Sequence, residues 1–287
     1  MNGCSISYLG DCHFDGQIKN MKVVDLITWF ESWVSPAWQE DWDNCGWQIE
    51  PGVLQLEAHV LVCLTPTLAV MNEAISIQKY GVPINLIFAH HPLILHPIKS
   101  LCSGNLLTEI SRLAFAHKIS IYTAHTNFDK VRDGTSDVLG QMLSLQGSVP
   151  IIPTQEDLGY GRVGDLPHSM TFQELLIKIH SKLHTSKLLF SPTTDLQQKI
   201  SRVAVLGGSG ASFISEVTKT SAELYLTSDC KFHQFQESRD AGLILVDAGH
   251  FATERPACNR LVQKLKSLPV DWVELSQKDE DFRHFYP

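Results

Sequence analysis

Six short apolar runs of strand length, separated by helical patterns, constrain the fold of this chain more than any other feature. They are residues 58–64 (AHVLVCL), 84–89 (INLIFA), 119–124 (ISIYTA), 202–206 (RVAVL), 223–227 (ELYLT) and 243–247 (LILVD). A strand that is apolar along its length must be covered on both faces, which is typical of mostly parallel sheets flanked by helices. The sequence therefore predicts an α/β fold.

Helical patterns fill the intervals between these runs. We expect helices over residues 21–34, 65–80, 105–117, 133–145, 171–184 and 254–268, the second of them capped by Thr65 and Pro66. The pattern occurs twice, so we predict two related α/β lobes with mostly parallel or mixed sheets covered by helices. The predicted division is an extension at 1–20, a first lobe at 21–149, a linker rich in proline and glycine at 150–168, and a second lobe at 169–287.

Charge and cysteine usage exclude several classes of protein. The net charge of −8 argues against a general nucleic-acid binder, which needs basic surface to neutralise phosphates. No apolar run approaches the roughly 20 residues that span a bilayer, and the first twenty residues do not resemble a signal peptide. The seven cysteines are odd in number and include no C-x-x-C pair, so we expect a reducing cytoplasm rather than a disulfide framework.

Metal-binding side chains follow three of the predicted strands, at the edge of the sheet where parallel α/β proteins gather ligands. The segments are FAHHPLIL with His90 and His91, TAHTNFD with His125 and Asp129, and VDAGHFATE with Asp247, His250 and Glu254. A single histidine at a strand end is more often a hydrogen-bonded packing residue than a ligand. Their joint occurrence favours a metal site.

The spacing of these residues indicates more than one ion. Neighbouring side chains on extended backbone point in opposite directions, so His90 and His91 are better placed to serve two ions than to chelate one. His250 and Glu254 lie four residues apart and would project from one turn of a helix. Imidazole with carboxylate suits zinc, iron or manganese and is too rich in nitrogen for calcium.

Other polar residues near the strand ends leave alternatives open. The run GGSGAS, Gly207 to Ser212, either cradles a phosphate or forms a tight turn, and we favour the turn. Asp229 and His233 orient the ligands, transfer protons or are simple loop residues. His125 orients Asp129, contacts substrate or acts as a general acid or base. Asp43 and its neighbour Asn44 either reach the site or form a plain turn.

Taken together, these segments resemble the GTP cyclohydrolase I type 2 homologues, also called NIF-three-like proteins. The matching pieces are EDWDNCGWQIEPG, LTPTLAVMNEAI, LIFAHHPLI, IYTAHTNFD, GYGRVGDLP, RVAVLGGSGAS, LYLTSDCKFHQ and VDAGHFATE, in family order from about Met21 to the C-terminus. The chain departs from the family around Asn44–Glu50 and at Ser228, where the family often has glycine.

The resemblance implies a dinuclear metal centre in the cleft between two α/β lobes, and often a homohexameric ring. Carried onto this chain, His91 and Asp129 would bind one ion, His90 and His250 the other, and Glu254 would bridge them. His125 and His233 match polar positions near the centre and are the candidate catalytic residues.

Two classes of function follow. The first is a metal-dependent hydrolase, with two divalent ions per chain, acting on a small nucleotide-like or phosphorylated substrate. The second is a non-enzymatic metal-handling or adaptor protein whose ring binds protein partners. A ring that associates with DNA is disfavoured by the acidic charge.

Overall fold

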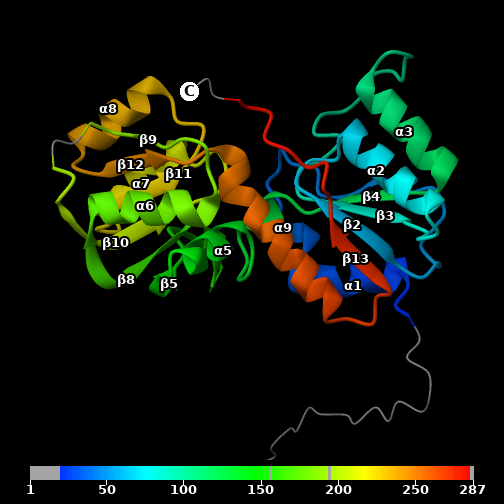
Figure 1. Cartoon of the computed structure of the whole chain (residues 1–287), viewed down its shortest axis with the longest axis horizontal. Coiled ribbons are helices and arrows are strands. Elements are labelled where there is room, and N and C mark those ends of the chain that lie inside the picture. Colours follow the sequence, from blue (N-terminus) through cyan, green and yellow to red (C-terminus); the bar gives the residue numbers. More distant parts are fainter. Residues whose placement is uncertain (1–19, 156, 193–194, 285–287) are drawn as a thin grey trace, which may run out of the picture.

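The computed structural model describes residues 20–155, 157–192 and 195–284, and these form two helix-covered sheets with a long helix between them (Figure 1). The α/β prediction is therefore confirmed. Most of the predicted extension at 1–20 lies outside the described residues. No helix in the described part of the chain is both long and apolar enough to cross a membrane.

The first sheet contains the three apolar runs from the N-terminal half of the chain. Its strands, in spatial order, are β1 (Gly46–Ile49), β4 (Ser120–Thr123), β3 (Leu86–Ala89), β2 (His59–Cys63) and β13 (Trp272–Leu275). The last four are mutually parallel, and β1 runs antiparallel to β4. Every residue of β2, β3 and β4 is buried, as expected for strands covered on both faces.

Alternate residues of these strands contribute to two different cores. Val60 and Val62 pack with α1 (Val23–Trp33) and with the long helix α9 (His250–Lys266). Leu61 and Cys63 face the opposite side, where α2 (Leu68–Lys79) and α3 (Leu106–His117) cover the sheet. A short 3-10 helix, η1 (Pro36–Trp38), follows α1.

The second sheet is mixed. Its strands, in spatial order, are β5 (Gln146–Val149), β8 (Arg162–Thr171), β10 (Lys199–Val205), β11 (Leu224–Thr227), β12 (Ile244–Asp247) and β9 (Leu189–Phe190), and β10, β11 and β12 are parallel. The elements α5 (Thr135–Met142) and α6 (Phe172–Leu183) cover one face. The other face packs against η2 (Ala211–Phe213), α7 (Ile214–Thr218) and α8 (Phe232–Asp240).

The predicted linker at 150–168 needs correction, because it is mostly strand. It contains β6 (Ile152–Gln155) and β7 (Leu158–Tyr160), which form a separate antiparallel pair, followed by the first residues of β8. The fully buried Arg162 donates to the carbonyl oxygens of Gly159 and Val131 and so ties this hairpin to the first half of the chain. Half-exposed antiparallel strands lack the continuous apolar runs that marked the other strands.

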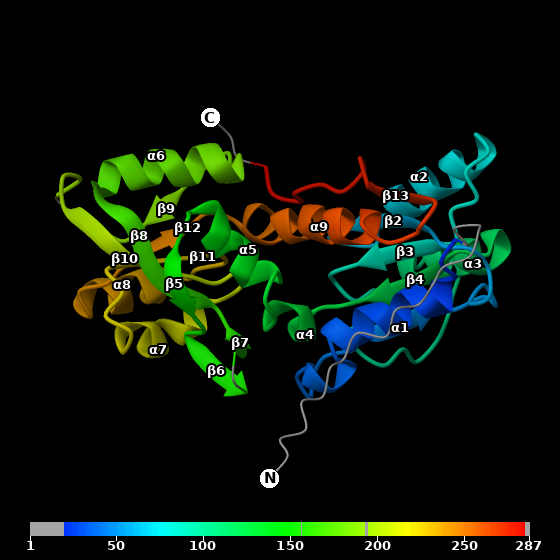
Figure 2. The same cartoon turned by 90° about the horizontal axis from the view of Figure 1, so that it is seen from below.

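Sheet membership also departs from the predicted lobe boundaries. β5 and α5, placed in the first lobe by sequence, pack with the second sheet. β13, placed in the second lobe, pairs with β2 in the first sheet. The helix α9 precedes it and lies between the two sheets, as Figure 2 shows. Both sheets thus depend on segments from the two halves of the sequence.

Candidate metal centre

The predicted metal ligands meet where the carboxyl ends of strands from both sheets face the start of α9. His90 and His91 follow β3, while Asp129 ends the short helix α4 (Thr126–Asp129), which follows the adjacent strand β4. His250 opens α9, and Glu254 stands one turn further along the same helix. The Nε2 atoms of His91 and His250 are 3.3 Å apart, so the two sheets contribute to one cluster.

The imidazole of His90 is the most constrained side chain of the cluster. Its Nδ1 lies 2.7 Å from the carbonyl oxygen of Ala124, so Nδ1 carries the proton and donates it. Its Nε2 is buried without a hydrogen-bond partner in the described part of the chain, 3.5 Å from Asp129 Oδ1. Burial lowers the pKa of His90 to about 3. A neutral, orphaned nitrogen of this kind is what a metal ligand requires.

Glu254 lies at the centre of the cluster. Its Oε2 is 2.9 Å from His91 Nε2, 2.8 Å from His250 Nε2 and 3.9 Å from His90 Nε2. Although burial raises the pKa of Glu254, the hydrogen bonds from His250 and His91 outweigh burial and hold that pKa well below its usual range. A buried, ionised carboxylate at the centre of such a cluster is suited to bridging two cations.

The pKa values of Asp129 and His250 are also shifted by their neighbours in the cluster. Burial and the charge of Glu254 raise the pKa of Asp129 to about 7. Burial lowers the pKa of His250, but hydrogen bonds with Asp229 and Glu254 raise it to about 10. These groups therefore keep protons at neutral pH, which neutralise the carboxylates. A bound divalent cation would neutralise the same carboxylates in place of those protons.

The distances group the ligands differently from the expectation carried over by resemblance. That expectation paired His91 with Asp129, and His90 with His250. In the structure His90 lies next to Asp129, while His91, His250 and Glu254 form a group whose ligand atoms lie within 4.8 Å of one another. The second such group contains His90, His91 and His125.

His91 and His250 each have a partner at Nδ1 that fixes the orientation of the imidazole. His91 Nδ1 shares a hydrogen bond of 2.8 Å with the hydroxyl of Thr65, and His250 Nδ1 one of 2.6 Å with Asp229 Oδ2. Thr65 is therefore not the expected helix cap, a role that Thr67 takes for α2. Partners at Nδ1 direct the Nε2 atoms into the cluster.

His125 lies beside the ligands and is held by a buried acid. Its Nδ1 is 2.8 Å from Asp43 Oδ1, and its ring centroid is 5.2 Å from that of His90. Burial raises the pKa of Asp43, but hydrogen bonds from His125 and Thr126 outweigh this and hold it well below its usual range. Asp43 thus reaches the site, which settles the alternative that sequence left open.

Two other sequence candidates lie elsewhere or act differently. His233 is exposed on α8, which packs on one face of the second sheet, and it is not among the described residues that line the cavity at the cluster. Asp247 accepts hydrogen bonds from the backbone N–H groups of Cys230 and Gly249. Its carboxylate therefore holds two loops in place instead of serving as a metal ligand.

The glycine-rich run after β10 packs against the cluster. The N–H groups of Gly207, Gly208 and Gly210 donate to the hydroxyls of Ser136, Thr253 and Thr227. These N–H groups are therefore not available to a phosphate, which supports the interpretation as a tight turn. A Cβ on Gly208 would lie 2.0 Å from Glu254 Oε1, so glycine is needed for this close approach.

A cavity of about 520 Å³ opens beside the cluster. His125, Asp129, His250 and Glu254 are among the residues that line it. Its walls carry Trp42, Tyr160 and Phe213, and the rings of Tyr160 and Phe213 are stacked at 19° with centroids 6.0 Å apart. A small molecule in this cavity could reach three of the candidate ligands, Asp129, His250 and Glu254, together with His125.

Fold and cluster together define the class: an α/β protein of two sheets with a candidate histidine–carboxylate metal site between them. Residues 21–280 match the family described as Duf34/NIF3 (NGG1p interacting factor 3), and the chain belongs to that family. This confirms the resemblance found in the sequence.

Individual relatives agree over nearly the whole chain. A protein of Nostoc sp. named "GTP cyclohydrolase 1 type 2 homolog" is 67% identical over 266 residues, covering 93% of this chain and 99% of the relative. The crystal structure of a Bacillus cereus protein related to NIF3 matches with a TM-score of 0.83 at 22% identity, over 93% of this chain and 100% of that one. Reduced HcgD from Methanocaldococcus jannaschii matches with a TM-score of 0.75 at 27% identity, over 90% and 98% of the two chains.

Proposed function

We propose that this protein binds two divalent metal ions in the cluster and hydrolyses a small nucleotide-like or phosphorylated substrate there. The observation that carries the proposal is His90 Nε2, a buried and unpartnered nitrogen 3.5 Å from Asp129 and 3.9 Å from Glu254. Imidazole with carboxylate suits zinc, iron or manganese. The name of the Nostoc relative supports a substrate of nucleotide type.

The distances suggest how the ligands divide. His90 and Asp129 would hold one ion, His91 and His250 the other, and Glu254 would bridge both. When bound, such a pair of ions acidifies a water molecule and polarises the bond that is attacked.

His125 is placed to move a proton. Because its Nδ1–H is engaged by Asp43, Nε2 is the nitrogen left to accept a proton from the attacking water. The same nitrogen would return that proton to the leaving group after the bond breaks. Asp43 keeps the ring in this tautomer and stabilises it while it is charged.

The cavity supports a substrate with a planar group. Its aromatic residues Trp42, Tyr160 and Phe213 offer ring faces and edges to a flat heterocycle. Neither Lys nor Arg is among the described residues that line it. A phosphate in this cavity would therefore depend on the metal ions for its charge partners.

Metal analysis of the purified protein tests the first half of the proposal. We expect two ions per chain by elemental analysis, with anomalous diffraction peaks between His90, His91 and Glu254. Glu254→Gln should lower the content of both, since this carboxylate serves both positions. Protein that holds no divalent metal even after reconstitution with Zn²⁺, Fe²⁺ and Mn²⁺ would sink the proposal.

Hydrolysis assays with a panel of nucleotides and phosphoesters test the second half. His125→Ala should keep its metal and lose about 10²- to 10⁴-fold in turnover, the usual contribution of a general base. His168→Ala, which removes an exposed imidazole on β8, is the matched control and should behave like the unmodified chain. A metal-loaded protein that is inactive on the whole panel contradicts the hydrolase assignment.

The alternative function is a non-enzymatic metal-handling or adaptor protein that forms an oligomeric ring, a hexamer by resemblance, and binds protein partners. It is supported by an exposed apolar patch over β9 and α8, where Phe232 is 88% exposed and Leu189 and Phe190 lie about a groove. The free cysteines of the described chain fit a cytoplasmic setting for either function. A His90→Ala/His91→Ala variant that complements a deletion strain, restoring the normal phenotype, would favour this alternative.

A further inference from the structure

The last described residues of the chain run from one sheet to the other. We call residues 276–284 the C-terminal strap. It leaves β13 at Ser276, whose N–H donates to the carbonyl oxygen of Val62 at 2.8 Å, and crosses toward the second sheet, as the red segment of Figure 1 shows. The strap therefore runs from the sheet whose strand β3 precedes His91 toward the sheet whose strand β12 precedes His250.

Its first contact lies behind His91. The buried carboxylate of Asp279 accepts hydrogen bonds from the N–H groups of Leu64, at 2.8 Å, and Thr65, at 3.4 Å. The Thr65 hydroxyl is in turn 2.8 Å from His91 Nδ1. Asp279 thus fixes the backbone from which the partner of His91 projects.

Its second contact lies behind His250. Arg283 Nη1 donates to Asp229 Oδ1 at 3.0 Å, while Asp229 Oδ2 holds His250 Nδ1 at 2.6 Å. The guanidinium also packs on the backbone beside this histidine, because a Cβ on Gly249 would lie 3.1 Å from Arg283 Nη2. One carboxylate therefore lies between the strap and the imidazole.

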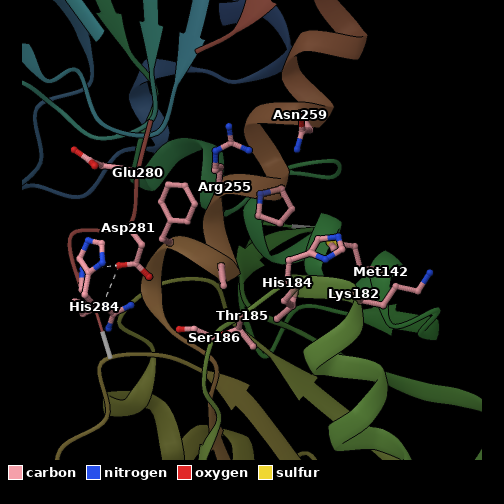
Figure 3. A pocket seen from close by; sticks show the side chains of 15 residues that line it. Met142, Lys182, His184, Thr185, Ser186, Arg255, Asn259, Glu280, Asp281 and His284 are labelled. Atoms are coloured by element: carbon pink, nitrogen blue, oxygen red, sulfur yellow. Dashed lines mark hydrogen bonds and ion pairs between the residues drawn. The ribbon is translucent and has the colours of Figure 1, made fainter. Parts of the chain in front are cut away.

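The strap is not packed against the side that faces α6. A cavity of about 700 Å³ separates Glu280, Asp281 and His284 from the end of α6 and the loop after it, residues 182–186 (Figure 3). Polar contacts therefore fix the strap: Ser276 and Gln277 donate to Glu73 at its start, and Asp279 and Arg283 hold it further along.

We propose that Arg283 and Asp279 are positioning residues for the metal centre, and that the strap orients His250 and His91, one from each side. This inference rests on the metal-binding function proposed above. The arginine holds Asp229 in position to accept a hydrogen bond from Nδ1–H of His250, so that Nε2 points into the cluster. Asp279 acts on His91 by fixing the backbone of Thr65, whose hydroxyl contacts His91 Nδ1.

The test is Zn²⁺ affinity, measured by competition with a chromophoric chelator. Arg283→Ala should weaken one of the two sites about 10-fold, and Asp229→Asn by about 10- to 100-fold, the usual range for groups that orient a metal-binding histidine. Arg283→Lys keeps a cation near Asp229 and should recover most of the loss. Arg239→Ala removes a comparable exposed pair with Asp240 and is the control.

A double mutant separates positioning from a general loss of structure. Arg283→Ala and Asp229→Asn act through the same imidazole, so their combined effect on affinity should be much less than the product of the two. Arg283→Ala and Asp279→Asn act on different histidines, so their effects should multiply. Spectra of the Co²⁺-substituted protein should change with each variant that weakens binding.

The outcomes distinguish this inference from the proposed function. If the unmodified chain does not bind Zn²⁺, the metal function itself fails. If it binds, but Arg283→Ala and Asp279→Asn bind with unchanged affinity and unchanged Co²⁺ spectra, the strap has no positioning role. If Arg283→Ala does not fold, Arg283→Lys and Asp279→Asn carry the same comparison.

Discussion

Gly208 shows how closely the backbone approaches the candidate ligands. It has a φ of +71°, and a Cβ at this position would meet Glu254 Oε1 at 2.0 Å and His250 Cε1 at 3.5 Å. The clash is with the buried end of a side chain that already contacts two histidines, so it cannot be relieved by a small rotation. We therefore expect Gly208→Ala to displace Glu254 and to lower the metal content measured by elemental analysis.

Gly242→Ala is the matched control for this substitution. Gly242 has a φ of +74°, but nothing lies within 4 Å of its Cβ position. Both variants should lose about 1 kcal/mol of unfolding free energy through the left-handed backbone. Gly208→Ala should lose about 1–3 kcal/mol more through the clash. Equal urea midpoints and full metal content in both variants would contradict this account.

At the residue scale, the cluster of candidate ligands could be predicted from the sequence, but the partners of its histidines could not. His90 and Asp129 follow adjacent parallel strands, whose carboxyl ends lie at one edge. Glu254 stands one helical turn after His250. The partners of His91 and His250, Thr65 and Asp229, are placed by loop geometry. Thr65 follows a strand, and the backbone of Asp229 is left-handed at φ 54°, which no periodic pattern encodes.

The turn between α4 and α5 is fixed to α9 by a single acid. The carboxylate of Asp133 pairs with Arg260 and, at 2.9 Å, with Lys264, both on α9. Burial raises the pKa of Asp133, but hydrogen bonds from Lys264 and Gln141 and the charge of Arg260 hold it below its usual range. The acid therefore binds protons less readily in the folded chain than in the unfolded chain.

The direction of the resulting pH dependence follows from this shift. Stability from Asp133 is fully present above its unfolded pKa of about 3.9 and is lost as pH falls through the lower folded value. Asp133→Asn should cost about 1 kcal/mol at neutral pH and flatten the stability profile below about pH 4. Urea unfolding across that range measures it. Asp25→Asn, at an exposed acid on α1, should keep the profile of the unmodified chain, and an unchanged profile in Asp133→Asn would refute the argument.

Element prediction succeeded for buried strands and failed for half-exposed ones. β2, β3, β11 and β12 all lie within the predicted apolar runs. The hairpin of β6 and β7 was missed because its exposed residues interrupt any apolar run. α9 was expected to begin at about Glu254, whereas it begins at His250 and contains Pro256.

Across the whole molecule, α9 joins the two sheets physically. Its residues Cys258, Leu261 and Leu265 belong to the core of the first sheet, while Ala252 packs against the core of the second. The helix also carries two of the candidate ligands at its N-terminal end. Its return to the first sheet through β13 could not be predicted from the apolar pattern, because that strand is only partly buried.

Because the candidate ligands come from β3, α4 and α9, metal binding should stabilise the contact between the two sheets rather than one sheet alone. Zn²⁺ at about 100 times its Kd would add about 2.7 kcal/mol to the unfolding free energy, enough to raise the melting temperature by several degrees. EDTA should reverse the shift. Glu254→Gln should abolish it, because this side chain contacts His91 and His250 from the centre of the cluster. A chain that loads with Zn²⁺ but melts at the same temperature with and without EDTA would mean that the metal does not link the two sheets.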